Sequence, residues 1–336
     1  MVINVTYDST VTGLANAAQV ETAFGVAVGS LENLYTNPIT VNLTVHWGTS
    51  SLGMSSFGLH GNPSYTQLTN ALAAARTTAM DSNAVANLPA SNPIGTNVWW
   101  IPRSEAKALN LGVAANATNS DGTVSFSSTV AWTFDPTNRA VPGAFDFIGV
   151  AEHEMTECLG RCFDLNDNPV GGYVPYDLFH FTGLGAQCLS VSNDPGVYFS
   201  IDKGVTDLKG FNPDVSLGDV QDWEPSSVPD SFDFELDDGV EGILSAADLI
   251  SVSILGYNLH FTPPTLTAVR QPNGNVTINF TNVTGLGFFV LGSSDVTLPT
   301  SSWTSLGAPV ETSIGHYQFT DTTTAQARRF YRVVLP

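Results

Sequence analysis

The sequence predicts an α+β protein of two domains, a mixed α/β domain over residues 1–261 and a small all-β sandwich over residues 262–336. Helical and strand periodicities alternate along the first part of the chain. The sequence composition changes at the pair Pro263-Pro264. Short segments rich in Val, Thr, Ile and aromatic residues follow it, and turn signals separate them. The length of 336 residues also suits two domains better than one.

The opening of the chain is predicted as strand, helix, strand. Residues 1–7 are strand-like. The next apolar residues recur at a spacing of three and four, which predicts an amphipathic helix of about five turns; they are Ala17, Val20, Phe24, Ala27, Leu31 and Leu34. Asn37-Pro38 ends this helix, because a residue that precedes proline avoids the helical conformation. Residues 39–45 then alternate apolar and polar side chains, as a half-buried strand does.

The middle of the first domain is predicted to contain two further helices and two strands. A helix over residues 65–80 follows Pro63-Ser64, and a strand lies around residues 98–101. A short helix capped by Ser104 comes next. A long strand then covers residues 123–134.

The C-terminal segments predict a small antiparallel β-sandwich. Its strands are expected at residues 266–270, 275–279, 287–291, 304–306, 316–320 and 329–334. The segment offers no cluster of His, Cys or acidic residues on which chemistry could be built. We therefore expect it to serve adhesion or targeting, or homo-assembly with further copies of the chain.

Composition narrows the function. Lys and Arg number 11 against 31 Asp and Glu, a formal net charge of −20 that repels phosphate backbones and anionic lipids. No segment approaches the ~20 apolar residues that span a bilayer. We expect no nucleic-acid partner and no membrane insertion. With only three lysines and abundant Thr, Ser, Asn and Gly, the composition favours a secreted, extracellular protein.

Residues 145–161 carry the strongest chemical signal. They predict a helix ended by Gly160, with a buried stripe formed by Ile148, Ala151, Met155 and Leu159. His153 and Glu157 are four residues apart, so an imidazole and a carboxylate project from one face and can hold one cation. Glu154 lies roughly 100° further round the helix, within reach of a water on that cation.

The H-E-x-x-E segment resembles the metzincin metallopeptidases, and more narrowly a group of secreted bacterial metalloproteases with an A-E-H-E-x-x-E-x-x-G-R helix. Residues 244–257 look like the closing helix of the matrixin-type enzymes. The resemblance covers most of residues 1–261 and implies a metzincin-like catalytic domain, with a twisted mixed sheet, an active-site helix and a zinc ion. It assigns the first ligand to His153, the general base to Glu154 and the second ligand to Glu157.

The chain departs from the metzincin pattern in three respects. The position of the usual third ligand, three residues after Gly160, is Phe163, which cannot bind a metal. No methionine follows Met155, so the methionine turn of that clan is absent. The second ligand is a carboxylate rather than an imidazole, which lowers the positive charge left on the metal and makes water bound there less acidic.

A third ligand must therefore come from further along the chain. Asp177 and His180 are the main candidates, and Asp164, just past the helix, is an alternative. One nitrogen and two carboxylates suit zinc and also harder cations such as manganese. Acidic residues are also frequent between residues 202 and 238, where oxygen-rich loops could bind a structural Ca²⁺ ion. Solvated loop charge is the alternative there.

The leading functional prediction is a secreted zinc endopeptidase that acts on protein or peptide substrates. His153, Glu157 and a downstream residue hold the ion, and Glu154 transfers a proton from the attacking water to the leaving amine. The alternative is a catalytically silent scaffold of the same fold, with a structural, adhesive or self-assembling role outside the cell. A metal-dependent hydrolase that acts on something other than peptide is a third, weaker reading.

Overall fold

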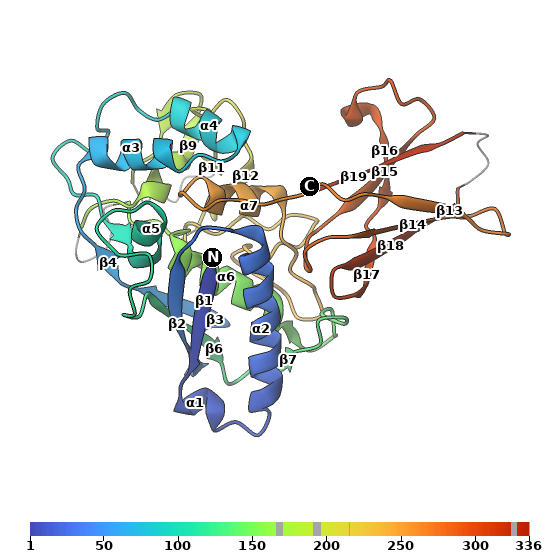
Figure 1. The fold of residues 1–336 in the computed structure, drawn as a ribbon, viewed down its shortest axis with the longest axis horizontal. Coiled ribbons are helices and arrows are strands. Elements are labelled where there is room, and N and C mark those ends of the chain that lie inside the picture. The colour runs from blue at the N-terminus through green and yellow to red at the C-terminus, as the bar shows by residue number, and fades with distance from the viewer. Residues whose placement is uncertain (166–170, 191–195, 215, 324–327, 336) are drawn as a thin grey trace.

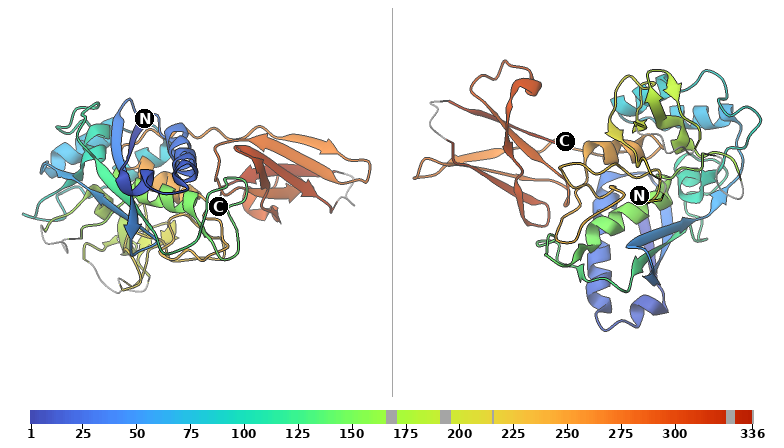
Figure 2. Two further views of the ribbon diagram at one scale, coloured as in Figure 1. Left: turned by 90° about the horizontal axis from the view of Figure 1, so that it is seen from below. Right: turned by 180° about the vertical axis from the view of Figure 1, so that it is seen from behind.

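The computed structural model describes residues 1–165, 171–190, 196–214, 216–323 and 328–335. These form a larger α+β lobe and a smaller all-β lobe that projects from one side of it (Figures 1 and 2). Leu259 still pairs with Tyr35 of the larger lobe, and the first strand of the smaller lobe begins at Thr267. The boundary predicted at residues 261 and 262 falls in this connection.

A four-stranded mixed sheet forms the centre of the larger lobe. Its strands are β1 (Val2–Tyr7), β2 (Thr40–Thr49), β3 (Gly53–Phe57) and β6 (Gly122–Ser127), in the order β1-β2-β6-β3. The first three in that order are parallel, and β3 runs antiparallel to β6 at the edge. Val41, Leu43 and Val45 of β2 are buried, which confirms the predicted alternation. The predicted strand over residues 123–134 ends instead at Ser127.

Two helices pack against this sheet and against each other (Figure 1). They are α2 (Ala17–Leu34), which follows the one-turn α1 (Ser9–Thr12), and α6 (Phe147–Leu159). The buried residues of α2 include Val20, Phe24, Ala27, Leu31 and Leu34, so the predicted apolar face is confirmed. The predicted stripe on α6 is also buried, but so are the other faces of that helix.

The segment predicted as one helix over residues 65–80 forms two. The first is α3 (Tyr65–Ala74), and the second is α4 (Ala79–Ala86). Thr78 begins α4 with a capping box, because its hydroxyl accepts from the Asp81 amide while Asp81 accepts from the Thr78 amide. This capping box begins a new helix after Thr78, so the first helix does not continue to residue 80.

Ser104 is not a helix cap. The short helix α5 (Arg103–Ala108) begins after Pro102, and Ser104 is buried inside it, where its hydroxyl donates to the carbonyl of Cys158 on α6. The two-residue strand β5 (Ile101–Pro102) directly precedes α5 and pairs with β4 (Leu59–His60). The strand predicted at residues 98–101 is therefore shorter than expected and begins at residue 101.

Two short parallel strands, β7 (Trp132–Thr133) and β8 (Phe145–Asp146), lie before α6 in the chain. The elements between α6 and the second lobe are the 3₁₀ helix η1 (Pro175–Phe179), the small sheet of β9 (His180–Gly183), β10 (Ala186–Gln187), β11 (Tyr198–Phe199) and β12 (Lys209–Gly210), and α7 (Ala246–Ser253). The last lies within residues 244–257, where the resemblance implied a closing helix. Long irregular segments separate these elements and surround α6 (Figure 2).

The smaller lobe consists of two antiparallel sheets, with strand orders β13-β14-β18-β17 and β16-β15-β19. The strands are β13 (Thr267–Arg270), β14 (Val276–Thr281), β15 (Phe289–Ser293), β16 (Thr304–Gly307), β17 (Val310–Ser313), β18 (His316–Asp321) and β19 (Phe330–Val334), with the 3₁₀ turn η2 (Thr300–Ser302) before β16. All six expected strands are present. The sequence analysis missed β17, a short and largely exposed edge strand.

The two lobes share one hydrophobic core. Leu244 forms a bridge with Leu286 of the smaller lobe, and its amide donates to the carbonyl of Gly285 at 2.9 Å. Leu286, Phe288 and Tyr317 belong to the same continuous cluster of buried residues as the interior of the larger lobe. The smaller lobe is therefore fixed to the larger one by buried apolar surface as well as by the connecting chain.

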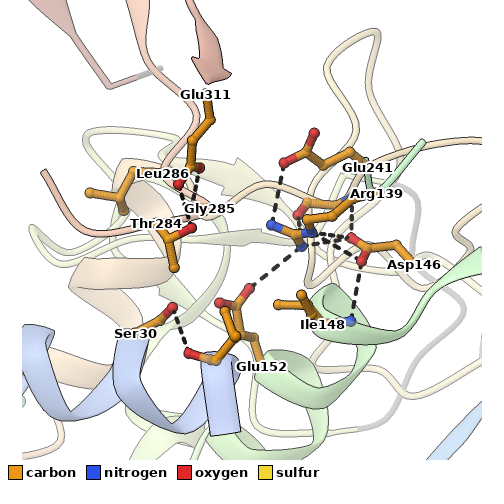
Figure 3. Close-up of polar contacts among 12 residues, drawn as sticks. Ser30, Arg139, Asp146, Ile148, Glu152, Glu241, Thr284, Gly285, Leu286 and Glu311 are labelled. Atoms are coloured by element: carbon orange, nitrogen blue, oxygen red, sulfur yellow. Dashed lines mark hydrogen bonds and ion pairs between the residues drawn. The ribbon is translucent and has the colours of Figure 1, made fainter. Parts of the chain in front are cut away.

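A buried arginine lies beside this junction (Figure 3). Arg139 is 4% exposed and binds both oxygens of Asp146 at 3.0 Å and the carbonyl of Gly242 at 2.7 Å, with Glu152 and Glu241 at 3.9 and 3.3 Å. Figure 3 also shows Gly285 of the smaller lobe next to this group. Arg139 thus connects the start of α6 with the segment that leads to the smaller lobe.

No helix among the described residues has the length and apolar character needed to cross a bilayer.

Candidate metal centre

The centre is built on α6, a helix that is buried on all sides. Asp146 caps its first turn by accepting from the amide of Ile148 at 3.1 Å. Gly160 ends it with φ of 120°, a conformation that favours glycine. Of the thirteen residues of α6, all of which are described, His153 alone is not buried, and its side chain is 12% exposed. The imidazole therefore stands where the helix meets a cleft.

Three buried glutamates on α6 have three different environments. Glu152 faces Arg139 (Figure 3). Glu157 accepts from the hydroxyl of Ser55 at 2.8 Å and from the side-chain amide of Gln221 at 2.7 Å. Glu154 lines the cleft, and its Oε2 atom has no hydrogen-bond partner among the described residues. A buried carboxyl without a partner is costly to stability, which marks Glu154 as a functional candidate.

His153, Glu157 and Asp222 form one group of donor atoms that lie within 4.8 Å of one another. The Nε2 atom of His153 is 3.5 Å from Oε1 of Glu157 and 3.2 Å from Oδ1 of Asp222. On the other side of the ring, Nδ1 donates to the carbonyl of Ser231 at 2.9 Å. This bond fixes the ring orientation and directs Nε2 at the two carboxylates, as carbonyl partners do for metal-binding histidines.

Asp222 is positioned by its neighbours in a long loop. Its carbonyl accepts from the amide of Asn212 at 2.7 Å, and the next residue, Trp223, is fully buried. The indole of Trp223 donates to Asp248 of α7 at 2.6 Å. The preceding residue, Gln221, donates to Glu157. The loop thus brings Asp222 to α6 through contacts on both sides of it, from a position about sixty residues away in the chain.

Arg161 is the fourth charged group of the centre. It is fully buried, with Nη1 at 3.0 Å from Asp222, Nη2 at 3.5 Å from Glu157 and the guanidinium 4.2 Å from the centre of the Phe232 ring. Its charge offsets one of the two carboxylate charges. His153, Glu157, Asp222 and Arg161 are therefore electrically balanced when His153 carries a proton.

The pKa values in the centre follow from burial and from these charges. Burial opposes the charged form of His153, but the charge of Asp222 and the hydrogen bonds with Asp222 and Glu157 together outweigh it and hold the pKa of His153 well above its usual value. Burial also disfavours ionised Glu157, yet its hydrogen bond with His153 and the charges of His153 and Arg161 lower its pKa to about 2. For Glu154, burial and then repulsion from Glu157 raise the pKa well above the usual value.

The cleft beside the centre has a volume of about 400 Å³. The edge strand β3 forms one wall, and α6 and residues 217–236 form the others. Gly53 allows β3 to approach α6 closely, because a Cβ atom there would lie 2.2 Å from Oε1 of Glu154 and 2.8 Å from a methyl group of Val150. The absence of a side chain at position 53 thus leaves room for the carboxyl of Glu154.

The structure brings together three of the five predicted site residues, His153, Glu154 and Glu157. Asp177, proposed as the third ligand, does not join them. Its carboxylate is fully buried and accepts from three backbone amides, those of Asp164 and Leu165 at 3.1 Å and that of Val174 at 2.9 Å. These bonds fix the chain after α6, so Asp177 has a structural position.

His180 and Asp164 also lie outside the donor group. His180 is buried, donates from Nδ1 to the carbonyl of Cys188 at 2.8 Å and packs against Phe163 with ring centres 4.8 Å apart. Asp222 takes the third position instead. It was one of many acidic residues between positions 202 and 238, and no spacing in the sequence distinguishes it from the others.

Other members of that acidic stretch form turns and ion pairs. Asp202 accepts from Thr206, Asp214 accepts from Ser216, and Asp230 pairs with Lys209. In the part of the chain that the structure describes, the group around His153 is the one set of three His, Cys, Asp or Glu donors close enough to hold an ion. A structural calcium site in these loops stays a prediction.

The donor set of the centre suits a divalent metal. One imidazole nitrogen and two carboxylate groups converge, and the imidazole is oriented from behind by a carbonyl. Arg161 leaves the set with a single net negative charge once His153 is neutral. A divalent ion held there would keep a positive charge, which compensates for the replacement of a second histidine by Glu157.

No family model, curated protein or solved structure matches the chain. The resemblance to metzincins stays a prediction, and the functional argument rests on the geometry of the centre.

Proposed function

We propose that the protein is a zinc-dependent endopeptidase in which His153, Glu157 and Asp222 hold the ion. The observation that carries this proposal is the orientation of His153, whose Nδ1 is bonded to a carbonyl and whose Nε2 is directed at two carboxylates. Beside it, the buried Glu154 lines a cleft, and its Oε2 atom has no partner among the described residues. The same donors accept harder ions such as manganese, so zinc is the first choice rather than a requirement.

The ion would act as a Lewis acid that polarises the scissile carbonyl and acidifies the attacking water. Glu154 accepts a proton from that water and passes it to the leaving amine. Its place on the wall of the cleft suits this task, because no hydrogen bond to a described residue occupies Oε2. Ser55 and Gln221 hold Glu157 in place from two sides, and Arg161 orients Asp222.

The test combines metal content with peptide hydrolysis. Protein stripped with a chelator and reloaded with Zn²⁺ should contain one ion per chain and cleave a denatured protein such as casein. Glu154→Gln should retain the ion but lower kcat by about 10²–10⁴-fold, the usual contribution of a general base.

Glu152→Gln is the matched control, because it makes the same change two positions earlier on the same helix. Burial raises the pKa of Glu152 to about 8, so this side chain is mostly neutral at pH 7 and an amide should replace it with little effect on activity. An equal loss of activity in Glu154→Gln and Glu152→Gln would show that activity is sensitive to any such substitution in α6. A loaded protein that cuts no peptide would refute the peptidase proposal.

The catalytically silent scaffold is the second candidate, and one observation favours it. Arg161 and a protonated His153 already neutralise Glu157 and Asp222, so the centre is a balanced ion-pair network without a metal. Exposed apolar side chains in the smaller lobe would serve assembly in this case; they include Val269, Val296, Leu298, Val310 and Ile314. Absence of stoichiometric metal, together with oligomers in sedimentation, would support this reading.

A further inference from the structure

Acidic side chains line the cleft next to the metal centre. Besides Glu154 and Asp222, which belong to the centre, Asp219 and Asp233 line it. None of the residues that the structure assigns to its walls is Lys or Arg. The remaining wall includes the apolar side chains of Met54, which is 50% exposed, and Leu217, which is 59% exposed.

Asp233 is the informative residue, because it is buried and incompletely bonded. It is 6% exposed, and its Oδ2 atom accepts from the amide of Asp230 at 3.0 Å. Its Oδ1 atom has no hydrogen-bond partner among the described residues. The nearby Lys209 is paired with Asp230. A buried carboxylate oxygen without a hydrogen bond, in a residue that lines a cleft, indicates a partner from outside the chain.

A second metal ion does not account for Asp233. In the described part of the chain, neither Asp219 nor Asp233 belongs to a group of three donors close enough to hold an ion. A cation on a flexible stem fits better, because its charged head can reach a carboxylate while its methylene groups lie along Met54 and Leu217. Lysine and arginine side chains have this form.

We propose that the cleft binds a lysine or arginine side chain of the substrate close to the scissile bond, with Asp233 at its base and Asp219 at its rim. This inference rests on the proposed peptidase function and names the substrate class for it. Basic peptides are also the substrates that a chain with net charge −20 attracts over a distance.

The test measures cleavage and binding separately. The Zn²⁺-loaded protein is incubated with a peptide mixture of broad sequence composition, and the cut sites are identified by mass spectrometry. Sites with Lys or Arg at one fixed position beside the cut should be enriched. In Asp233→Asn, kcat/KM for a basic peptide should fall about tenfold or more relative to a matched peptide with Gln in place of the basic residue. Asp207→Asn, the same change at an exposed position outside the cleft, is the control and should leave the ratio unchanged.

The binding arm uses the Glu154→Gln protein and calorimetry with the same two peptides. Tighter binding of the basic peptide, reduced by Asp233→Asn and by Asp219→Asn, supports the inference. If the active protein nevertheless cuts no peptide, only the peptidase proposal fails. Cleavage without enrichment of basic residues, or equal affinity for the two peptides, overturns the inference and leaves the peptidase proposal in place.

Discussion

At the scale of single residues, neighbouring glutamates on one helix have different roles because their partners differ. Glu152 faces Arg139, Glu157 faces His153 and Arg161, and Glu154 faces the cleft. The sequence pattern H-E-x-x-E predicts that His153, Glu154 and Glu157 lie together, since the spacing alone places them on adjoining faces of a helix. It contains nothing about Asp222, which arrives from a distant loop.

The first prediction separates the proposed ligand Asp222 from the structural residue Asp177. Asp222→Asn should weaken zinc binding by more than the roughly 10–100-fold lost when an outer partner of a ligand is removed. Asp177→Asn should leave one zinc per chain but lower the free energy of unfolding by about 1–3 kcal/mol, because a side-chain amide cannot accept from all three backbone amides. Zinc titration and urea denaturation measure the two effects. Loss of zinc in Asp177→Asn at full folding would restore Asp177 as a ligand.

At the scale of elements, the errors of the sequence analysis occur where a signal is short or absent. The edge strand β3 has no alternating apolar pattern, and its residues are small or half-exposed, so nothing in positions 53–57 predicts a strand. It forms because β6 offers an open edge for pairing. Yet β3 supplies one wall of the cleft and the Ser55 hydroxyl that holds Glu157.

The second prediction concerns the spacing between β3 and α6. Gly53→Ala places a methyl group against Glu154 and Val150, so either the strand or the carboxyl must move. We expect kcat/KM to fall by about tenfold or more, since displacement of a catalytic group by about 1 Å can cost 10²-fold, while zinc content stays at one per chain. Gly25→Ala on α2, where a Cβ atom meets nothing within 4 Å, is the matched control. Unchanged hydrolysis in Gly53→Ala would mean that this spacing does not limit catalysis.

At the scale of the whole molecule, buried carboxyl groups make the stability depend on pH. Burial raises the pKa of Glu105 well above its usual value of 4.5. Burial also raises the pKa of Glu152 from 4.5 to about 8. At a pH between the usual pKa of each group and its raised pKa, the folded chain retains a proton that the unfolded chain has released. The free energy of unfolding therefore falls as the pH rises through this window, by at most about 1.4 kcal/mol per pH unit for each group.

The third prediction follows from that dependence. Urea denaturation of the metal-free protein at pH 5, 6, 7 and 8 should show stability declining from pH 5 to pH 8. Glu152→Gln should reduce the slope, because the amide has no proton to lose, and the exposed Glu235→Gln should not. Stability that increases over this range would contradict the assignment of neutral carboxyl groups in the interior.

The fourth prediction tests the shared core of the two lobes. Because Leu286 is 3% exposed and lies against the larger lobe through Leu244, we expect a single calorimetric unfolding transition for the whole chain. Leu286→Ala should lower the free energy of unfolding by about 2–5 kcal/mol and shift that one transition. Leu298→Ala, at a 44% exposed site in the same lobe, should change it by less than about 0.5 kcal/mol. Two transitions, with only one of them shifted, would show that the lobes fold independently.

The sequence by itself determined the mixed first lobe, the β-rich second one, the helices α2 and α6, and the pairing of His153 with Glu157. These depend on periodicity and on caps, which act between residues within a few positions of one another. The tertiary structure alone decided that Asp222 completes the centre, that Asp177 ties down a loop and that β3 lines the cleft. Those outcomes depend on contacts between segments about sixty or more residues apart, which only the packed core brings together.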